Sequence, residues 1–145
     1  MSGPEPGLGL PYGPGFLFVD RVMFHAADGR IVTEKEFRAT DPILRAHFDG
    51  GPPVVPGVIL VEMASQSALL WALRHGRLAP GARLLLGSIK ATFLHQAVAD
   101  CEVTARVTVE SPAGGFAFKG ELWSDDHNLA RVHGLGMAVP TGEPG

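Results

Sequence analysis

His47 and Glu62 are the two residues of this sequence whose types and surroundings best suit acid–base chemistry. Glu62 lies among apolar residues in Val58-Ile59-Leu60-Val61-Glu62-Met63-Ala64, where a carboxylate is costly unless it is paired or stays protonated. An imidazole titrates near neutral pH, so a histidine and a carboxyl group with a raised pKa form a pair that can move protons in catalysis. For each residue alone, a purely structural role is the alternative interpretation.

Three further residues near Glu62 in the sequence have types that suit a binding site. Gln66 lies four positions after Glu62, on the same face of a helix, where it can hydrogen-bond the carboxyl group. Gly57 and Val58 stand at the expected start of that helix, where backbone N–H groups lack partners and the helix dipole is positive. Because glycine also permits close approach to the backbone, these two residues are candidates for binding a carbonyl or oxyanion. An ordinary helix start has the same pattern and is the alternative.

A rigid loop and a long helix are the elements that must position these residues. The run Gly50-Gly51-Pro52-Pro53-Val54-Val55-Pro56 excludes a regular helix or a central strand. Residues 57–74 predict a helix with apolar side chains on nearly all faces, which must therefore be buried on most sides, and Gly76 ends it. Asp41-Pro42 predicts a short helical turn over 42–47, with the aspartate as its N-cap and the histidine at its end.

The rest of the sequence predicts β-structure. Strands are expected over 16–24, 31–37, 83–95, 100–110, 115–124 and 128–139. The order is thus two strands, one helix and four strands, and an antiparallel sheet wrapped around the helix is the simplest way to bury it, which is an α+β architecture. Exposed sheet edges indicate a dimer. Residues 1–15 predict an irregular arm, 16–139 a single domain and 140–145 a flexible tail.

Composition restricts the partners and the compartment. The 145-residue chain has a formal net charge of −3, which argues against bulk nucleic-acid binding and leaves room for a local basic patch. Its apolar run over 58–73 is interrupted by polar residues, so no membrane span is expected. The single cysteine, Cys101, excludes an intramolecular disulfide and favours a reducing cytoplasm. The other histidines lack metal-ligand spacing, and no metal site is expected.

The segment from His47 to Gln66 resembles the active-site region of the bacterial 3-hydroxyacyl-acyl-carrier-protein dehydratases. It runs His47-Phe48-Asp49-Gly50-Gly51-Pro52-Pro53-Val54-Val55-Pro56-Gly57-Val58-Ile59-Leu60-Val61-Glu62-Met63-Ala64-Ser65-Gln66. The family pattern is His-Phe-Pro-Gly-x-Pro-Val-Met-Pro-Gly-Val, then Glu or Asp, then Gln four positions further on. The similarity extends to Leu10-Pro11, Phe16-Leu17-Phe18-Val19-Asp20-Arg21-Val22, Ile89-Lys90-Ala91-Thr92-Phe93, Asp100 and Phe118-Lys119-Gly120, so it covers almost the whole chain.

This resemblance implies a hot-dog fold and a catalytic mechanism. His47 and Glu62 would be the catalytic pair, facing each other across a dimer interface, with Gly57 and Val58 binding the substrate carbonyl and Gln66 in support. Neutral His47 would remove the α-proton of a 3-hydroxyacyl thioester, and protonated Glu62 would release the hydroxyl as water. The product would be a 2-enoyl thioester of fatty acid or polyketide-type biosynthesis, formed without any cofactor.

The partners implied by the resemblance are an acyl carrier protein and further copies of the chain. We expect a homodimer or a higher homo-oligomer in the cytoplasm, with a heterodimer also open, and neither nucleic acid nor membrane as a partner. The length of the acyl chain, and the choice between carrier protein and coenzyme A, stay open.

The chain departs from the family pattern in three places. Asp49 replaces a proline, Pro14-Gly15 replaces Tyr-Pro, and one extra loop residue puts His47 and Glu62 fifteen positions apart instead of fourteen. Since a shift of about 1 Å between catalytic groups can cost about a hundredfold in rate, the loop favours an unusual acyl chain and a specialised pathway such as polyketide assembly. The alternatives are a hot-dog thioesterase or isomerase, and a non-catalytic subunit of a heterodimer.

Overall fold

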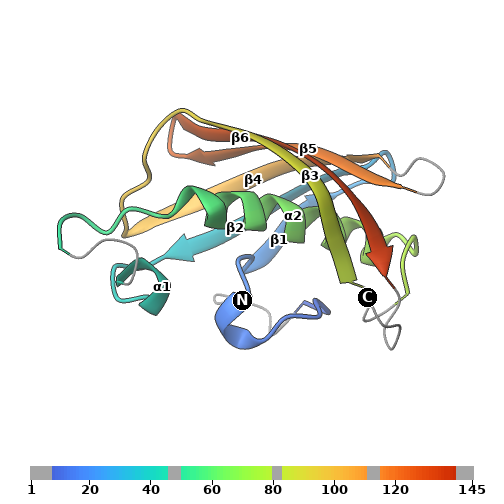
Figure 1. The fold of residues 1–145 in the computed structure, drawn as a ribbon, viewed down its shortest axis with the longest axis horizontal. Helices are drawn as coiled ribbons and strands as arrows, with labels where there is room; N and C mark the ends of the chain where they lie inside the picture. Colours follow the sequence, from blue (N-terminus) through green and yellow to red (C-terminus); the bar gives the residue numbers. More distant parts are fainter. Residues whose placement is uncertain (1–7, 46–49, 80–82, 111–114, 140–145) are drawn as a thin grey trace.

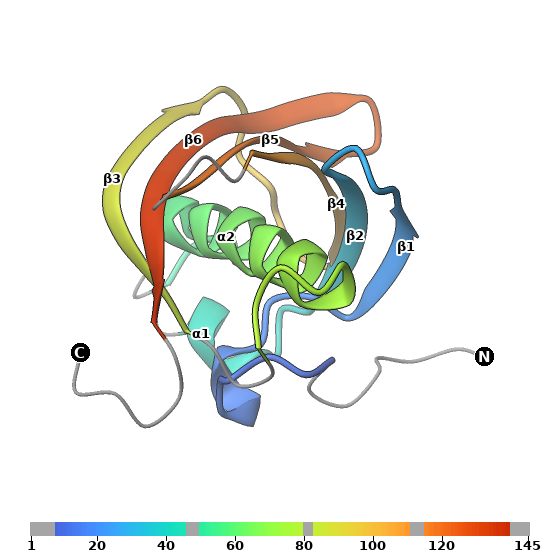
Figure 2. The same cartoon turned by 90° about the vertical axis from the view of Figure 1, so that its right-hand side faces the viewer.

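A six-stranded antiparallel sheet wraps around one long helix, α2 (Gly57–Arg74), as Figures 1 and 2 show. This computed structural model describes residues 8–45, 50–79, 83–110 and 115–139. The strands are β1 (Arg21–His25), β2 (Arg30–Phe37), β3 (Arg83–Phe93), β4 (Cys101–Glu110), β5 (Phe116–Ser124) and β6 (His127–Val139). They lie in the order β1-β2-β4-β5-β6-β3. The architecture predicted from the order of the elements is confirmed.

The concave face of the sheet forms the main wall around α2. Twelve of the eighteen residues of the helix are buried. Along β4, which contacts α2, Val103, Ala105 and Val107 are buried, whereas Arg106 between them is exposed. This alternation is the period-two pattern of a sheet that buries one face. The apolar faces of the helix therefore pack against buried apolar residues of the sheet.

Local sequence decides where α2 begins and ends. Pro56 precedes the helix with φ −59° and ψ 138°, and no side chain caps the first turn. At the other end Gly76 has a φ of 66°, a conformation that costs glycine little. The N–H of Arg77 donates to the carbonyl of Ala72 at 2.8 Å, which together with the left-handed glycine terminates the helix in a Schellman motif. The helix predicted over 57–74 is confirmed.

An N-terminal arm, described from residue 8 onward, lies on the side of α2 that the sheet leaves open, together with the turns η1 (Pro14–Phe16) and α1 (Pro42–Arg45) (Figure 2). Its buried apolar residues are Leu10, Phe18 and Val19. The strand predicted over 16–24 is wrong for its first part, because β1 begins only at Arg21. The reason is a competing hydrogen bond, in which the N–H of Phe18 donates to Oε1 of Gln66 at 2.8 Å.

The remaining predicted strands are confirmed to within two residues at each end. The short turn predicted over 42–47 is present as α1, and its last two positions lie outside the described residues. The predicted end of the irregular arm at residue 15 and the predicted tail stay predictions. In the part of the chain that the structure describes, no helix has the length and apolar character needed to cross a membrane.

Removing part of a fully buried side chain of α2 tests this core. Leu69 has no exposed surface, so we expect Leu69→Ala to lower the free energy of unfolding by about 2–5 kcal/mol, measured by urea denaturation. Leu135 on β6 is 57% exposed, and Leu135→Ala is the matched control, with an expected loss below about 0.5 kcal/mol. Equal losses in the two variants would contradict the placement of α2 at the centre.

Candidate active site

The loop that leads into α2 is tied to the segment after β3. Two backbone hydrogen bonds and a β-bridge join residues 53–55 to residues 97–99, and the bond donated by the N–H of Val55 measures 2.8 Å. Gly50 and Gly51 have φ values of 83° and 80°, which glycine adopts far more readily than other residues. The rigid loop expected from the sequence is therefore present, and it fixes the position at which the helix starts.

The first two residues of α2 carry free backbone donors. In the described part of the chain, no acceptor takes a hydrogen bond from the N–H of Gly57 or Val58, whereas the next N–H, of Ile59, donates to the carbonyl of Pro56 at 3.0 Å. The ring of Phe93, at the end of β3, lies against Gly57, since a Cβ there would come within 2.7 Å of it. Val58 is 72% exposed. Free N–H groups at a helix start can stabilise a carbonyl oxygen that gains negative charge.

Gln66 joins the N-terminal arm to the helix. The side chain has no exposed surface. Its Oε1 accepts from the N–H of Phe18 and its Nε2 donates to the carbonyl of Phe16, both at 2.8 Å. A carboxamide nitrogen has two hydrogens, and Gln66 also hydrogen-bonds Glu62, one turn earlier. The arm thus fixes the side chain of Gln66, one helical turn from the carboxyl group of Glu62.

Glu62 sits half-buried between polar and aromatic neighbours. Burial raises the pKa of Glu62, and the hydrogen bond from Gln66 offsets part of that rise. Burial and then the negative charge of Glu62 raise the pKa of the Tyr12 phenol, so the two side chains are close enough to interact. The Tyr12 ring centroid lies 5.6 Å from that of Phe16. A carboxyl group whose pKa is raised keeps its proton to higher pH and can serve as an acid.

The structure thus brings together four of the five residues singled out in the sequence. Gly57, Val58, Glu62 and Gln66 lie within the first ten residues of α2, and His47 lies outside the described residues. Tyr12 and Phe93 were missed as neighbours of the site. The sequence gives each of them only a weak indication, because they come from an irregular arm and from the end of a strand, and chain folding alone brings them to α2.

Metal ions need a set of ligand side chains that lie close together. Among residues 8–45, 50–79, 83–110 and 115–139, no group of three or more His, Cys, Asp or Glu side chains is placed to hold a metal ion. The groups that the described site offers are a carboxyl, a carboxamide, a phenol and two backbone N–H groups. These suit proton transfer and carbonyl polarisation.

The fold places the protein in the hot-dog class. The dehydratase heterocomplex ApeI:P from Xenorhabdus doucetiae has a TM-score of 0.75 with 12% identity, over 92% of this chain and 90% of that one. A hypothetical thioesterase with coenzyme A from Streptococcus pneumoniae TIGR4 has a TM-score of 0.64 with 12% identity, over 82% and 84% of the two chains. Both share a fold with this protein, and at these identities the likeness extends no further.

The sequence comparisons define the family within that class. This chain belongs to the FabA-like domain family, whose model matches residues 10–133. It is 32% identical over 132 residues to a 3-hydroxyacyl-[acyl-carrier-protein] dehydratase FabZ of Anaeromyxobacter dehalogenans strain 2CP-C, covering 89% of this chain and 80% of the relative. The FabZ of Klebsiella pneumoniae is 31% identical over 114 residues, 77% of this chain and 75% of that protein. The family resemblance stated from the residues is confirmed.

The raised pKa of Glu62 makes stability depend on pH in a defined direction. In the unfolded chain the carboxyl group ionises at lower pH, so ionisation favours unfolding above the folded-state pKa, and this penalty vanishes below the unfolded value of about 4.3. Glu62→Gln should therefore raise Tm by about 1–3 °C at pH 8, because partial exposure limits the penalty to below roughly 1 kcal/mol. The gain should disappear at pH 4. Differential scanning calorimetry at both pH values checks this, and a gain that is larger at pH 4 would contradict it.

Proposed function

We propose that this chain is a 3-hydroxyacyl-acyl-carrier-protein dehydratase, which removes water from a 3-hydroxyacyl thioester to give a 2-enoyl thioester. The observation that carries the proposal is the half-buried Glu62, whose pKa burial raises, on a helix whose first N–H groups are free. The names of the FabZ relatives support the same reaction. The compartment proposed is the cytoplasm, because one cysteine in 145 residues suits a reducing environment.

In the proposed mechanism the substrate carbonyl accepts a hydrogen bond from the N–H of Gly57, assisted by Val58, which makes the C2 proton more acidic. His47, neutral, takes that proton and becomes an imidazolium ion. The C3–O bond breaks as Glu62 transfers its proton to the hydroxyl, so water leaves, a C2=C3 double bond forms and Glu62 is left as a carboxylate. Return of the proton from His47 to Glu62 through solvent resets the pair.

The proposed assembly is a homodimer formed through β3. This eleven-residue strand lies at the edge of the sheet, and in the described part of the chain nothing pairs with its outer side. Its exposed apolar residues are Leu85, Leu86, Ile89 and Phe93. A long apolar edge strand is a ready surface for pairing with another chain. Phe93 and the exposed Val58 lie at the site itself, so a second copy would enclose it. The family resemblance implies that His47 of the second copy then works with Glu62.

The substrate carrier is proposed to be an acyl carrier protein, on the strength of the names of the relatives. The extra loop residue and Asp49 favour an unusual acyl group from a specialised pathway, which stays a hypothesis about this chain. A thioesterase of the same fold would release free thiol from an acyl thioester, and a non-catalytic partner subunit would show no turnover alone. The dehydratase, the thioesterase and the non-catalytic subunit each predict a different outcome of one assay.

That assay is mass spectrometry of a short panel of 3-hydroxyacyl carrier proteins incubated with the purified protein. We expect loss of one water from the acyl group, and Glu62→Gln should slow it by about 10²–10⁴-fold, since the amide cannot donate the proton that the leaving hydroxyl needs. His47→Ala should have a similar effect. Asp126→Asn, at an exposed position in the turn between β5 and β6, is the control and should keep full activity. Full activity in both catalytic variants would refute the proposal.

Mixing two inactive variants tests whether the site is shared between subunits. Equal amounts of His47→Ala and Glu62→Gln protein, unfolded and refolded together, should regain about a quarter of the wild-type rate, because half of the dimers are mixed and each of these has one intact site. The same variants refolded separately and then assayed together should stay inactive. Failure of the co-refolded mixture to regain activity, with mixed dimers verified by native mass spectrometry, would place the whole site within one chain.

A further inference from the structure

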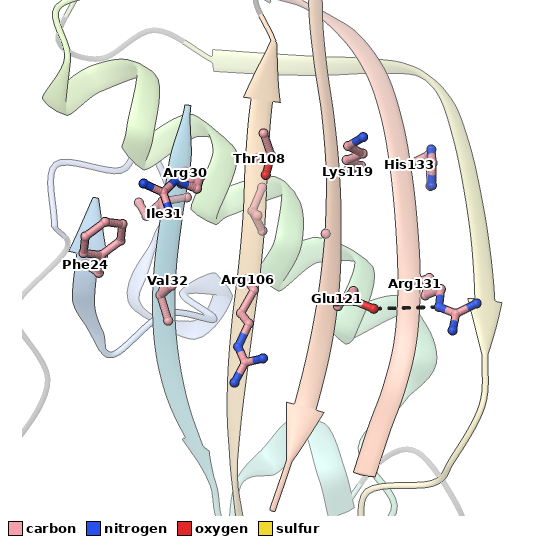
Figure 3. A pocket seen from close by; sticks show the side chains of 12 residues that line it. Phe24, Arg30, Ile31, Val32, Arg106, Thr108, Lys119, Glu121, Arg131 and His133 are labelled. Atoms are coloured by element: carbon pink, nitrogen blue, oxygen red, sulfur yellow. Dashed lines mark ion pairs between the residues drawn. The ribbon is translucent and has the colours of Figure 1, made fainter. Parts of the chain in front are cut away.

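The outer face of the sheet, turned away from α2, carries side chains in rows that run across the strands (Figure 3). The first row consists of directly opposed residues from five strands, in the order Arg30, Thr108, Lys119, His133 and Lys90. The second row, two positions along each strand, consists of Val32, Arg106, Glu121, Arg131 and Thr92. In Figure 3, Lys119 and His133 lie side by side on neighbouring strands.

The two rows differ in how they arrange charge. The second row alternates in sign, with Glu121 between two arginines and 3.8 Å from Nε of Arg131. The first row places His133 between Lys119 and Lys90, with no acid at any of these three positions. Opposed residues on neighbouring strands have Cβ atoms about 5 Å apart, and like charges there destabilise the sheet. Lys119 and Lys90 lie two strands apart, about 10 Å, so they repel each other less than directly opposed charges would, and no acid in their row offsets that repulsion.

Two carboxyl groups line the hollows beside the row, those of Glu121 and Glu110, and neither forms an ion pair with Lys119 or Lys90. Arg30, at the far end of the row, is neutralised by Asp28 at 2.8 Å. Lys119 and Lys90 form no ion pair within 4.0 Å and no hydrogen bond with any described residue, and the hydroxyl of Thr108 likewise has no partner there. Both lysines are exposed. Four donors thus stand in line across four strands, roughly 14 Å at the spacing of strands, without an acceptor.

Two hollows flank this line of donors. One, of about 540 Å³, lies toward β1, and the other, of about 410 Å³, lies toward the start of β5. Both are lined by Thr108, Lys119 and His133. Apolar side chains enter each hollow, Phe24 in the first and Leu135 in the second. Hollows of this size suit a small molecule, so the donors lie where such a molecule would place its most polar group.

We propose that the row Thr108–Lys119–His133–Lys90 binds the phosphate or diphosphate group of a small soluble ligand. A phosphate group carries up to two negative charges and several acceptor oxygens, which match two lysines, an imidazole and a hydroxyl in line better than a single carboxylate does. A second copy of this chain is disfavoured as the occupant, because it would bring a second basic row against the first. A membrane is disfavoured because the convex, hollowed face does not match a flat surface (Figure 2).

This site is separate from the dehydratase site. Neither hollow is lined by any residue of α2. Glu62 and Gly57 belong to α2, which lies on the opposite, concave face of the sheet. Ligand binding on the outer face therefore does not depend on the proposed reaction. The variant Glu62→Gln should bind a phosphate probe as the wild type does, so the two proposals can fail independently.

Calorimetric titration of the full chain with sodium pyrophosphate at low ionic strength tests the proposal. We expect saturable binding that Lys119→Gln and Lys90→Gln each weaken by about tenfold, since a charge-assisted hydrogen bond contributes about that much. Arg83→Gln removes the same charge at an exposed position seven residues before Lys90 on β3, and it should change affinity by less than about twofold. Absence of saturable binding, or equal weakening by all three variants, would overturn the proposal.

Thermal unfolding supplies a second readout. Without added anion, Lys119→Gln should raise Tm at low ionic strength because it relieves repulsion within the row. Pyrophosphate should raise the Tm of the wild type more than sodium chloride of equal ionic strength does, and this extra rise should be smaller for Lys119→Gln. An equal rise in both proteins would mean general screening only. Co-sedimentation with phosphatidylglycerol vesicles that pyrophosphate does not reverse would show a lipid surface as the partner instead and overturn the choice of a soluble ligand.

Discussion

An eighteen-residue helix with apolar side chains on nearly every face has to be covered on every side, and the rest of the molecule is arranged to do this. The sheet covers α2 on its concave face, and the N-terminal arm covers the side that the sheet leaves open. Among the described residues, the start of α2 at Val58 stays exposed, with the ring of Phe93 beside it and the edge of β3. The proposed chemistry lies in this region. The proposed site thus lies at the part of the helix that the rest of the described chain leaves uncovered.

Burying α2 also buries polar groups, and the side chains of Gln66 and Ser67 among them are paired. The hydroxyl of Ser67 donates to the carbonyl of Met63 at 2.7 Å and lies 2.8 Å from the hydroxyl of Thr33 on β2. Gln66 bonds the arm on one side and Glu62 on the other. A buried polar group that loses its partner costs about 1–3 kcal/mol. The polar residues of the helix therefore fix its rotation against the sheet and the arm, and this rotation decides which face presents Glu62.

Features set by neighbouring residues could be predicted from the sequence, whereas features set by strand order could not. The ends of α2 follow from Pro56 and Gly76, and the choice of Gly57, Glu62 and Gln66 follows from their spacing on a helix. The start of β1 was misplaced because a side chain of the helix, distant in sequence, takes the N–H of Phe18. The row Thr108–Lys119–His133–Lys90 on the outer face could not be predicted either, because it also depends on contacts between residues distant in the sequence. Its members come from four separate strands and meet only through the register of the pairings.

The position of β3 has a consequence for the way this chain is made. Its one neighbour in the sheet is β6, the last strand of the chain. A ribosome releases a chain from its N-terminus at about 5–20 residues per second, so β3 emerges with neither of its sides occupied and stays that way until β6 has emerged. The nascent chain therefore holds an apolar strand with two open sides for several seconds. A chain cut short before β6 would lose its final strand and, with it, every sheet contact of β3.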